Sequence, residues 1–422
     1  MQRPPQMLQA RYLPVLDGLR AVSIGLVVVS HLGIGGVGFE RVVPGAFGVT
    51  LFFFISGYLI TRQLLGALVA RGQIGFARFY ARRALRLMPA GVAYIVVAGC
   101  CYQLAGGRIS AAGWAAALLY GANYFDLWHG YRSSLAGVRH PFNILWSLAI
   151  EEHFYLLWPA ALALIWRLRG DDLKLTKVFA SFFKKKCFFL FFFEKKNQKT
   201  FVHFALGSGR ALEFVLLLCV AVLLWRFVLL QICFAPGAPA VCGPENPNPL
   251  WRYNRLYLAT DARLDSIAWG AALALLEARG ILLARWAWVP GAALLAVSFA
   301  GGGPLARDVI RPTLQGVALL AIVPSLLAGA GWGARTLAAR PLVYVGRLSY
   351  SLYLWHWGAL AVADWCAPRF GAVWLSLAVA LSALMALASY HGIERPMLRL
   401  RHRFGSHAPV GLTDAGAGDA AD

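Results

Sequence analysis

The chain has 422 residues, of which 59% are hydrophobic, and a formal net charge of +21. Its mean hydropathy of +0.61 excludes an ordinary soluble domain and is typical of a polytopic membrane protein. The positive charge does not indicate a nucleic-acid partner, because the basic residues fall mainly between apolar spans, as the positive-inside bias predicts. Seven cysteines without metal-ligand spacing predict no metal site.

The first predicted span, Leu13–Leu32, is about 20 residues long and mostly apolar. It contains Asp17, Arg20 and His31, and charged residues in a span usually face a bundle interior or a wet cavity. Arg20 and His31 are 11 residues apart, which puts them on one helix face about 16 Å apart along the axis. Asp17 is placed to pair with Arg20. The helix therefore either carries a base deep in the membrane or combines an interfacial arginine with a packed histidine.

The second predicted span, Gly45–Leu65, is followed by an arginine-rich stretch with almost no acidic residues. This composition predicts a cytoplasmic loop and hence a cytoplasmic N-terminus. The stretch includes Arg82, Arg83 and Arg86 in the sequence RRALR. Clustered guanidinium groups bind phosphates, although a topology signal alone would also explain these residues.

The third predicted span is Leu87–Leu104. The next apolar stretch, Ser110–Phe125, is short for a transmembrane span. We expect that stretch to be re-entrant or interfacial. The fourth span, Asn143–Leu168, holds Glu151 and Glu152 among aromatic residues. Adjacent side chains point about 100° apart on a helix, so one glutamate should face the interior and pair with a cation or a substrate hydroxyl. The alternative is an interfacial charge beside an aromatic belt.

A segment of foreign composition follows the fourth span. Lys174–Lys199 contains all eight lysines of the chain and many of its phenylalanines. We therefore divide the chain into a membrane domain, 1–404, with a low-complexity insert at about 171–207, and a disordered C-terminal tail, 405–422. No chemistry is assigned to the insert, although its basic and aromatic residues would also suit anionic lipid headgroups.

The rest of the chain adds six predicted spans, so the expected fold is all-α, a polytopic helical bundle of about ten transmembrane helices. The bundle is expected to cross the cell inner membrane several times, with both termini cytoplasmic. Cys233 and Cys242 flank a Pro-rich loop and can form a disulfide if that loop is extracytoplasmic. The six spans are Ala211–Phe234, Tyr257–Leu276, Trp286–Ala300, Thr313–Ala330, Val343–Trp365 and Ala372–Tyr390.

Two of these spans carry polar residues. TDARLDSIAWG contains Asp261, Arg263 and Asp265 at the mouth of a span, and Asp261 and Asp265 share a helix face. RLSYSLYLWHW places His356 among aromatic residues within a later span. Taken alone, His356 is better explained by packing than by chemistry.

Together, seven segments resemble acyltransferase family 3, a family of integral membrane O-acyltransferases, and they occur in the family's order over nearly the whole chain. The segments are LDGLRAVSIGLVVVSH, GVTLFFFISGYLIT, FYARRALRLMP, WSLAIEEHFYLLWP, ATDARLDSIAWG, SYSLYLWHW and SYHGIERP.

The family's pairs of functional residues carry over to matching positions. Its Arg and His separated by ten residues fall on Arg20 and His31, its Arg-x-x-Arg pattern on Arg83 and Arg86, and its Glu-Glu on Glu151 and Glu152. The usual Gln after that glutamate pair is His153 here, so this position departs from the family pattern.

The resemblance implies transfer of an acyl group, commonly acetyl from acetyl-CoA, to a hydroxyl of a carbohydrate or glycosylated acceptor. A sugar hydroxyl needs a base during attack, and histidine suits that task. We therefore predict His31 as general base and Arg20 as a residue that holds the geometry. Asp17 or Glu151 would orient the imidazole or bind acceptor hydroxyls. The arginines of RRALR would bind the phosphates of CoA.

Further candidate contacts to substrate are Tyr155, Asp261, Arg263, Asp265 and His356. No oxyanion stabiliser is identified from the sequence. Two alternatives stay open. A proton-coupled carrier of a lipid or sugar would also need intramembrane His, Glu and Arg, and the Lys/Phe-rich insert is compatible with an inactive family member.

Overall fold

The computed structural model describes residues 12–33, 45–129, 139–167, 193–195, 202–234, 242, 255–284, 286–329, 331–369 and 371–400. This part of the chain is almost entirely helical, which confirms the predicted all-α membrane bundle in its class. The C-terminal tail and most of the Lys/Phe-rich insert lie outside the described residues.

The N-terminal half supplies long helices and two short ones. They are α1 (Pro14–His31), α3 (Gly45–Arg71), α4 (Phe76–Leu104), α5 (Ala111–Leu118), α6 (Ala122–His129) and α7 (Leu145–Arg167). A 3-10 turn, Pro141–Ile144, leads directly into α7.

The C-terminal half begins with α9 and ends with the continuous run of α16 and α17. Its helices are α9 (Val202–Cys233), α10 (Arg255–Leu258), α11 (Thr260–Ala278), α12 (Trp288–Ala300), α13 (Arg311–Leu327), α14 (Trp332–Leu337), α15 (Arg340–Cys366), α16 (Ala372–Ser389) and α17 (Arg395–Leu400). Strands β1 (Phe193–Lys195) and β2 (Ile281–Leu283) form one short antiparallel pair.

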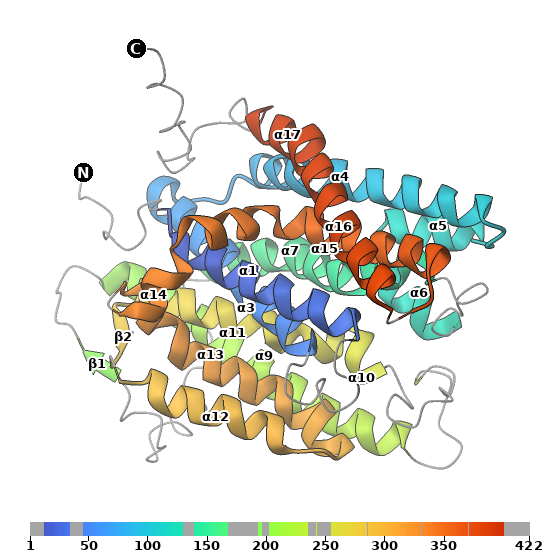
Figure 1. Cartoon of the computed structure of the whole chain (residues 1–422). Coiled ribbons are helices and arrows are strands. Elements are labelled where there is room, and N and C mark those ends of the chain that lie inside the picture. Colours follow the sequence, from blue (N-terminus) through green and yellow to red (C-terminus); the bar gives the residue numbers. More distant parts are fainter. Residues whose placement is uncertain are drawn as a thin grey trace.

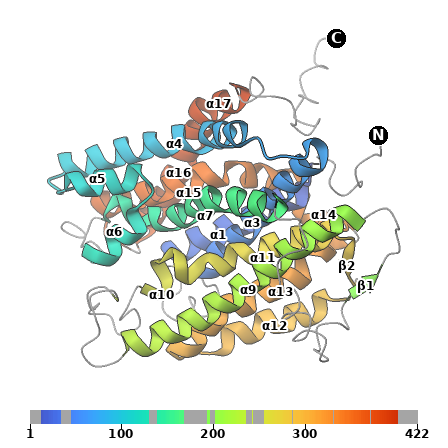
Figure 2. The same ribbon diagram turned by 180° about the vertical axis from the view of Figure 1, so that it is seen from behind.

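The long helices run side by side in one bundle (Figures 1 and 2). In its interior, α11 packs against α3, α9 and α13, while α1 packs against α3 and α15. α12 lies beside α13 at one side of the bundle, and α4 runs along the opposite side with α5. The site described below lies between α1, α3, α4, α7 and α15.

Within the part of the chain that the structure describes, seven helical stretches are long and apolar enough to cross a membrane, which indicates a membrane protein. Each of the ten predicted spans coincides with a helix, but three of those helices do not meet the same criteria. α11 contains four charged residues, α12 has 13 residues, and α15 is rich in Ser, Tyr and Trp. The count of ten spans and the orientation of the termini therefore stay predictions.

The helix α4 begins well before the predicted third span. It starts at Phe76 rather than near Leu87, because the intervening residues include neither Gly nor Pro. Gly72, with φ +69°, separates α3 from α4. The extension places Arg83 and Arg86 on the helix α4 itself, ahead of the predicted third span.

The segment after α4 forms two short helices rather than a span. α5 and α6 have eight residues each, and a helix needs about 17–25 residues to cross a bilayer. Tyr120, between them, has φ +57°, a conformation uncommon outside glycine. This arrangement agrees with the expected re-entrant or interfacial element.

Close backbone contact fixes α1 against α15. A Cβ atom on Gly346 would lie 1.8 Å from the carbonyl oxygen of Asp17, so only glycine allows this approach. The two helices run in the same direction from that contact, toward His31 on α1 and His356 on α15. Elsewhere, the predicted disulfide between Cys233 and Cys242 is present.

Candidate functional site

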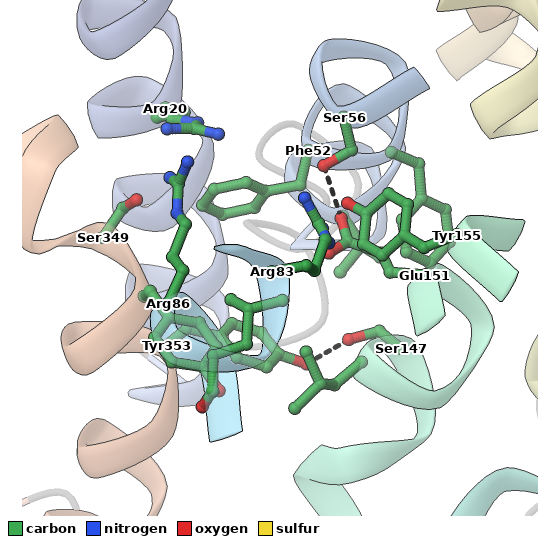
Figure 3. Close-up of a pocket in the computed structure, with 15 residues that line it drawn as sticks. Arg20, Phe52, Ser56, Arg83, Arg86, Ser147, Glu151, Tyr155, Ser349 and Tyr353 are labelled. Carbon is green, nitrogen blue, oxygen red and sulfur yellow. Dashed lines mark hydrogen bonds between the residues drawn. The ribbon is translucent and has the colours of Figure 1, made fainter. Parts of the chain in front are cut away.

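A pocket between five helices, open in part to solvent, contains about 630 Å³ of space not filled by atoms (Figure 3). It is lined by both polar and aromatic side chains. The lining residues are Arg20, Val49, Phe52, Phe53, Ser56, Arg83, Arg86, Leu87, Ser147, Leu148, Glu151, Tyr155, Ser349, Tyr350 and Tyr353.

Three arginines from two helices reach this pocket. Arg20 comes from α1, and Arg83 and Arg86 come from the extended part of α4. Figure 3 shows the guanidinium groups of Arg20 and Arg86 pointing toward one another. Guanidinium groups that converge in this way suit an anion with several oxygens, such as a phosphate.

Arg83 has a different environment from Arg86. Its guanidinium carbon lies 3.1 Å from the centre of the Tyr155 ring, as a cation–π contact. Its Nε atom is 3.9 Å from a carboxylate oxygen of Glu152. The aromatic face and the carboxylate hold this arginine at the wall of the pocket.

Glu151 is the acidic residue among the pocket-lining residues. Its Oε1 accepts a hydrogen bond of 2.8 Å from the hydroxyl of Ser56. The lining holds one carboxylate and three guanidinium groups, while Asp17 and Glu152, which do not line it, pair with Arg20 and Arg83. Of the two adjacent glutamates, Glu151 lines the pocket, and Glu152 faces Arg83, which lines it too.

Tyr353 and Phe52 contribute aromatic rings to the lining of the pocket. The Tyr353 hydroxyl donates to the carbonyl oxygen of Ile144 at 2.8 Å and is also hydrogen-bonded to Ser147. Its ring packs edge-on against Phe52, with ring centres 6.4 Å apart. The Tyr353 ring centre is 5.9 Å from that of His356.

His31 and His356 form a direct pair. His31 Nδ1 is 2.9 Å from His356 Nε2, and the two rings are almost parallel. Trp357 packs edge-on against His31. His356 is fully buried, whereas His31 is partly exposed. His356 was predicted as a substrate contact, and the structure places it against the predicted base.

Arg139 lies at the same end of the bundle as the histidine pair. Its guanidinium group contacts the backbone oxygen of His31 at 3.5 Å and the ring of Trp357 at 5.1 Å. Asp364 holds it through a 3.0 Å ion pair. Sequence reasoning missed Arg139, because it lies outside the motifs in a short connection before α7.

Asp17 lies at the other end of α1 from His31. It accepts a hydrogen bond of 2.7 Å from the Tyr12 hydroxyl and is 3.7 Å from Arg20, which is the predicted pair. Burial and this hydrogen bond raise the pKa of Tyr12, so its hydroxyl remains a donor. The residue that contacts the imidazole of His31 is therefore His356, in place of Asp17 or Glu151.

The charged residues of α11 lie in other contacts. Asp261 is bound by Arg255 through two hydrogen bonds of 2.8 and 2.6 Å. Asp265 forms a fully buried ion pair with Arg226 at 2.6 Å.

The third charged residue of that motif, Arg263, donates to Thr50 at 3.2 Å. The structure brings none of these three α11 residues into the lining of the pocket. Their roles as substrate contacts stay predictions, and their described contacts are those of a helix-packing network.

Two further positions of the motifs are placed by the structure. His153, where the family pattern has Gln, is hydrogen-bonded to Thr260 at 2.7 Å and so links α7 to α11. Arg82 does not line the pocket, unlike its neighbour Arg83. Three serines and two tyrosines of the lining were not singled out from the sequence, although polar residues in apolar helices were a signal for them.

Among the residues that the structure describes, no group of three or more His, Cys, Asp or Glu is placed to hold a metal ion. The pocket and the histidine pair are built from the segments that carried the sequence resemblance. Ser56, Glu151 and His356, for example, come from three different motifs.

Comparison with known proteins identifies relatives over most of the chain. The chain is 27% identical to the putative peptidoglycan O-acetyltransferase YrhL of Bacillus subtilis over 415 residues, covering 92% of this chain and 55% of that protein. It is also 27% identical to the peptidoglycan O-acetyltransferase OatA of Listeria monocytogenes, covering 92% and 56%, and to the O-acetyltransferase OatA of Staphylococcus aureus, covering 94% and 59%. No solved structure matches.

The chain thus spans a little more than half the length of these relatives. The acyltransferase domain of acyltransferase family 3 matches residues 13–391, which include every helix that lines the pocket. The chain belongs to this family of membrane acyltransferases.

Proposed function

We propose that the chain is a membrane O-acyltransferase that moves an acyl group, in the first place acetyl, from acyl-CoA to a hydroxyl of a carbohydrate. The relatives are named for peptidoglycan and O-acetyl transfer, so a peptidoglycan-type glycan is the acceptor to test first. The observation that carries the proposal is the placement of a three-arginine pocket and a histidine pair on the two sides of Tyr353.

The donor site is proposed to be the pocket. CoA carries phosphates, and Arg20, Arg83 and Arg86 provide planar groups that bind phosphate oxygens in pairs. The long arm of CoA would run from these arginines toward Tyr353, which places the thioester near the histidine pair. Glu151, held by Ser56, is then a wall residue that repels a misplaced anion.

The reaction is proposed to take place at His31. Its Nε2 removes the proton from the acceptor hydroxyl while the hydroxyl oxygen attacks the thioester carbonyl carbon. The carbon–sulfur bond then breaks, and the proton on His31 Nε2 passes to the leaving sulfur of CoA. A positioned base of this kind contributes typically ~10²–10⁴-fold.

The test is acetyl transfer by the full chain in lipid nanodiscs, with labelled acetyl-CoA and a peptidoglycan glycan as acceptor. His31→Gln keeps a polar side chain but cannot take the proton, so we expect transfer to fall by roughly 10²-fold or more while acetyl-CoA still binds. His129→Gln is the matched control, because His129 is an exposed histidine at the end of α6.

Substantial turnover by a well-inserted His31→Gln protein would remove His31 from the mechanism. Binding of acetyl-CoA without any transfer by the unmodified chain, together with uptake of the glycan into sealed vesicles, would favour the carrier alternative. If neither binding nor transfer occurs in the unmodified chain, the inactive-member alternative is favoured.

A further inference from the structure

We infer that His356 is a positioning residue that fixes the tautomer of His31, so that the lone pair for proton removal resides on His31 Nε2. This inference rests on the proposed function, because it assigns a partner to the proposed base. It follows from hydrogen-bonding rules applied to three consecutive groups: the carbonyl of Leu352, the imidazole of His356 and the imidazole of His31.

The carbonyl of Leu352 determines which ring nitrogen of His356 carries the proton. His356 Nδ1 is 3.0 Å from the backbone oxygen of Leu352. A carbonyl oxygen only accepts hydrogen bonds, so His356 Nδ1 must carry the proton. In a neutral imidazole the other ring nitrogen is then the acceptor. His356 Nε2 therefore presents a lone pair.

The imidazole of His356 in turn determines which ring nitrogen of His31 carries the proton. His31 Nδ1 is 2.9 Å from His356 Nε2, and since His356 Nε2 accepts, His31 Nδ1 must donate. A neutral His31 with its proton on Nδ1 has its lone pair on Nε2. This is the nitrogen farther from His356, on a residue that is partly exposed, whereas His356 is fully buried.

The same geometry explains why His356 is not itself the base. Both of its ring nitrogens are engaged, one by Leu352 and one by His31, and the ring is 0% exposed. A base must reach the proton that it removes. His356 can act only through its neighbour, in the way that the third member of a catalytic triad orients the histidine.

The surroundings hold both rings in this arrangement. Trp357 packs edge-on against His31 and donates its indole N–H to the backbone oxygen of His140. Tyr353, one helical turn before His356, is fixed by Ile144. When His31 takes a proton on Nε2, its Nδ1–H stays on His356, so the pair needs no rearrangement during the reaction.

The inference gives a spectroscopic test that does not depend on turnover. In protein labelled with 15N-histidine, the nitrogen shifts separate protonated from unprotonated ring nitrogens, and the His31 signals are identified by their loss in His31→Gln. We expect neutral His31 to be protonated on Nδ1 and unprotonated on Nε2. A proton on Nε2 instead would overturn the inference.

A kinetic test separates positioning from packing. His356→Leu keeps the bulk but removes the acceptor, and we expect kcat for acetyl transfer to fall by about 10²-fold with KM for acetyl-CoA unchanged. His356→Gln retains an acceptor oxygen and should recover part of kcat. His391→Leu is the control, since His391 is an exposed histidine on the same C-terminal part of the bundle.

The outcomes distinguish this inference from the proposed function. Full activity of His31→Gln removes the proposed base, whatever His356 does. An inactive His31→Gln with a fully active His356→Leu leaves the base in place and overturns the positioning role. Equal losses of kcat in His356→Leu and His356→Gln, with an unchanged His31 tautomer in both, would likewise assign His356 to packing alone.

Discussion

At the scale of single residues, the site combines side chains that differ in how firmly the fold holds them. Arg83 lies on the ring of Tyr155 with Glu152 beside it, so its position is set by the protein. Arg86 points instead toward Arg20 (Figure 3). The Asp17 carboxylate is already 3.7 Å from Arg20. A phosphate between Arg20 and Arg86 would accept hydrogen bonds from both guanidinium groups.

This difference predicts unequal effects of substituting the two arginines of α4. Arg86→Ala should weaken acetyl-CoA binding by about 10- to 150-fold, the equivalent of ~1.5–3 kcal/mol for a charge-assisted contact. Arg86→Lys should recover only part, because lysine lacks the planar fork. The measurement is equilibrium binding of acetyl-CoA to protein in nanodiscs.

The controls for this prediction come from the same helix. Arg78→Ala removes an exposed arginine of α4 and should leave binding unchanged. Arg83→Ala should weaken binding and also lower thermal stability, since it removes a packed cation–π contact. Unchanged acetyl-CoA affinity in both Arg83→Ala and Arg86→Ala would leave these residues as topology signals only.

The charged residues of the pocket lining and both histidines could be predicted, but most of the other lining residues and the pairing of the histidines could not. Arg20, Glu151 and His31 stand out because a charge or an imidazole in an apolar span is costly unless it has a role. The contact between His31 and His356 joins positions 325 residues apart. Helical periodicity shows which residues share a face of one helix, but it does not show which other helix that face meets.

At the scale of elements, the registration of α1 against α15 places the two histidines together. Their contact begins where Gly346 meets the backbone of Asp17. From there, His31 is 14 residues along α1 and His356 is ten residues along α15, distances of about 21 and 15 Å at 1.5 Å per residue. The side chains of the two imidazoles cover the remaining offset.

A methyl group at the contact between Gly346 and Asp17 should change the geometry of the His31–His356 pair, although neither histidine is part of that contact. Gly346→Ala places a Cβ 1.8 Å from a backbone oxygen, so α1 and α15 must move apart. We expect a loss of stability of about 1–3 kcal/mol, as for overpacking, and a fall in kcat of roughly 10²-fold from misplacement of His31. Thermal unfolding and acetyl transfer measure the two effects.

Gly392→Ala is the matched control for that substitution. A Cβ on Gly392, in the π-helical turn after α16, meets nothing within 4 Å, so only a small change is expected. Normal stability and normal kcat in Gly346→Ala would show that the α1–α15 contact does not set the geometry of the site.

The sequence predicted which stretches are helical better than it predicted the residues at which the helices begin and end. Apolar runs of the required length located the ten predicted spans, because hydropathy measures transfer into lipid directly. The start of α4 at Phe76 could not be located in this way, since the added residues are basic and amphipathic. The result matters for function, because this extension carries the arginines that reach the pocket.

At the scale of the whole molecule, the pocket and the histidine pair lie at different depths of one bundle. Arg20 lies near the start of α1 and His31 is its last residue, about 16 Å further along the axis. The disulfide at the end of α9 and the Asp364–Arg139 ion pair near the end of α15 mark helix ends. The predicted orientation assigns these ends to the extracytoplasmic side.

That orientation predicts which side of the membrane each helix end meets. Gly72 joins α3 to α4 next to Arg71, so a cysteine introduced there should react only with a reagent on the cytoplasmic side. Cys366 is exposed at the end of α15 and should react only from outside. The measurement is labelling of intact cells and of inverted vesicles, after Cys100, Cys101 and Cys187 are replaced by alanine.

Each position is the control for the other. A preparation that labels one cysteine should leave the other cysteine unlabelled. Labelling of Gly72→Cys from outside would mean that the whole bundle has the opposite orientation. The arginine pocket would then lie toward the wrong side for cytoplasmic acyl-CoA. Labelling of both positions from one side would instead mean that α15 and α3 do not cross as predicted, which would contradict the ten-span topology without reversing it. With the expected result, acyl-CoA would enter from the side of Gly72, and the acyl group would have to pass Tyr353 to reach His31.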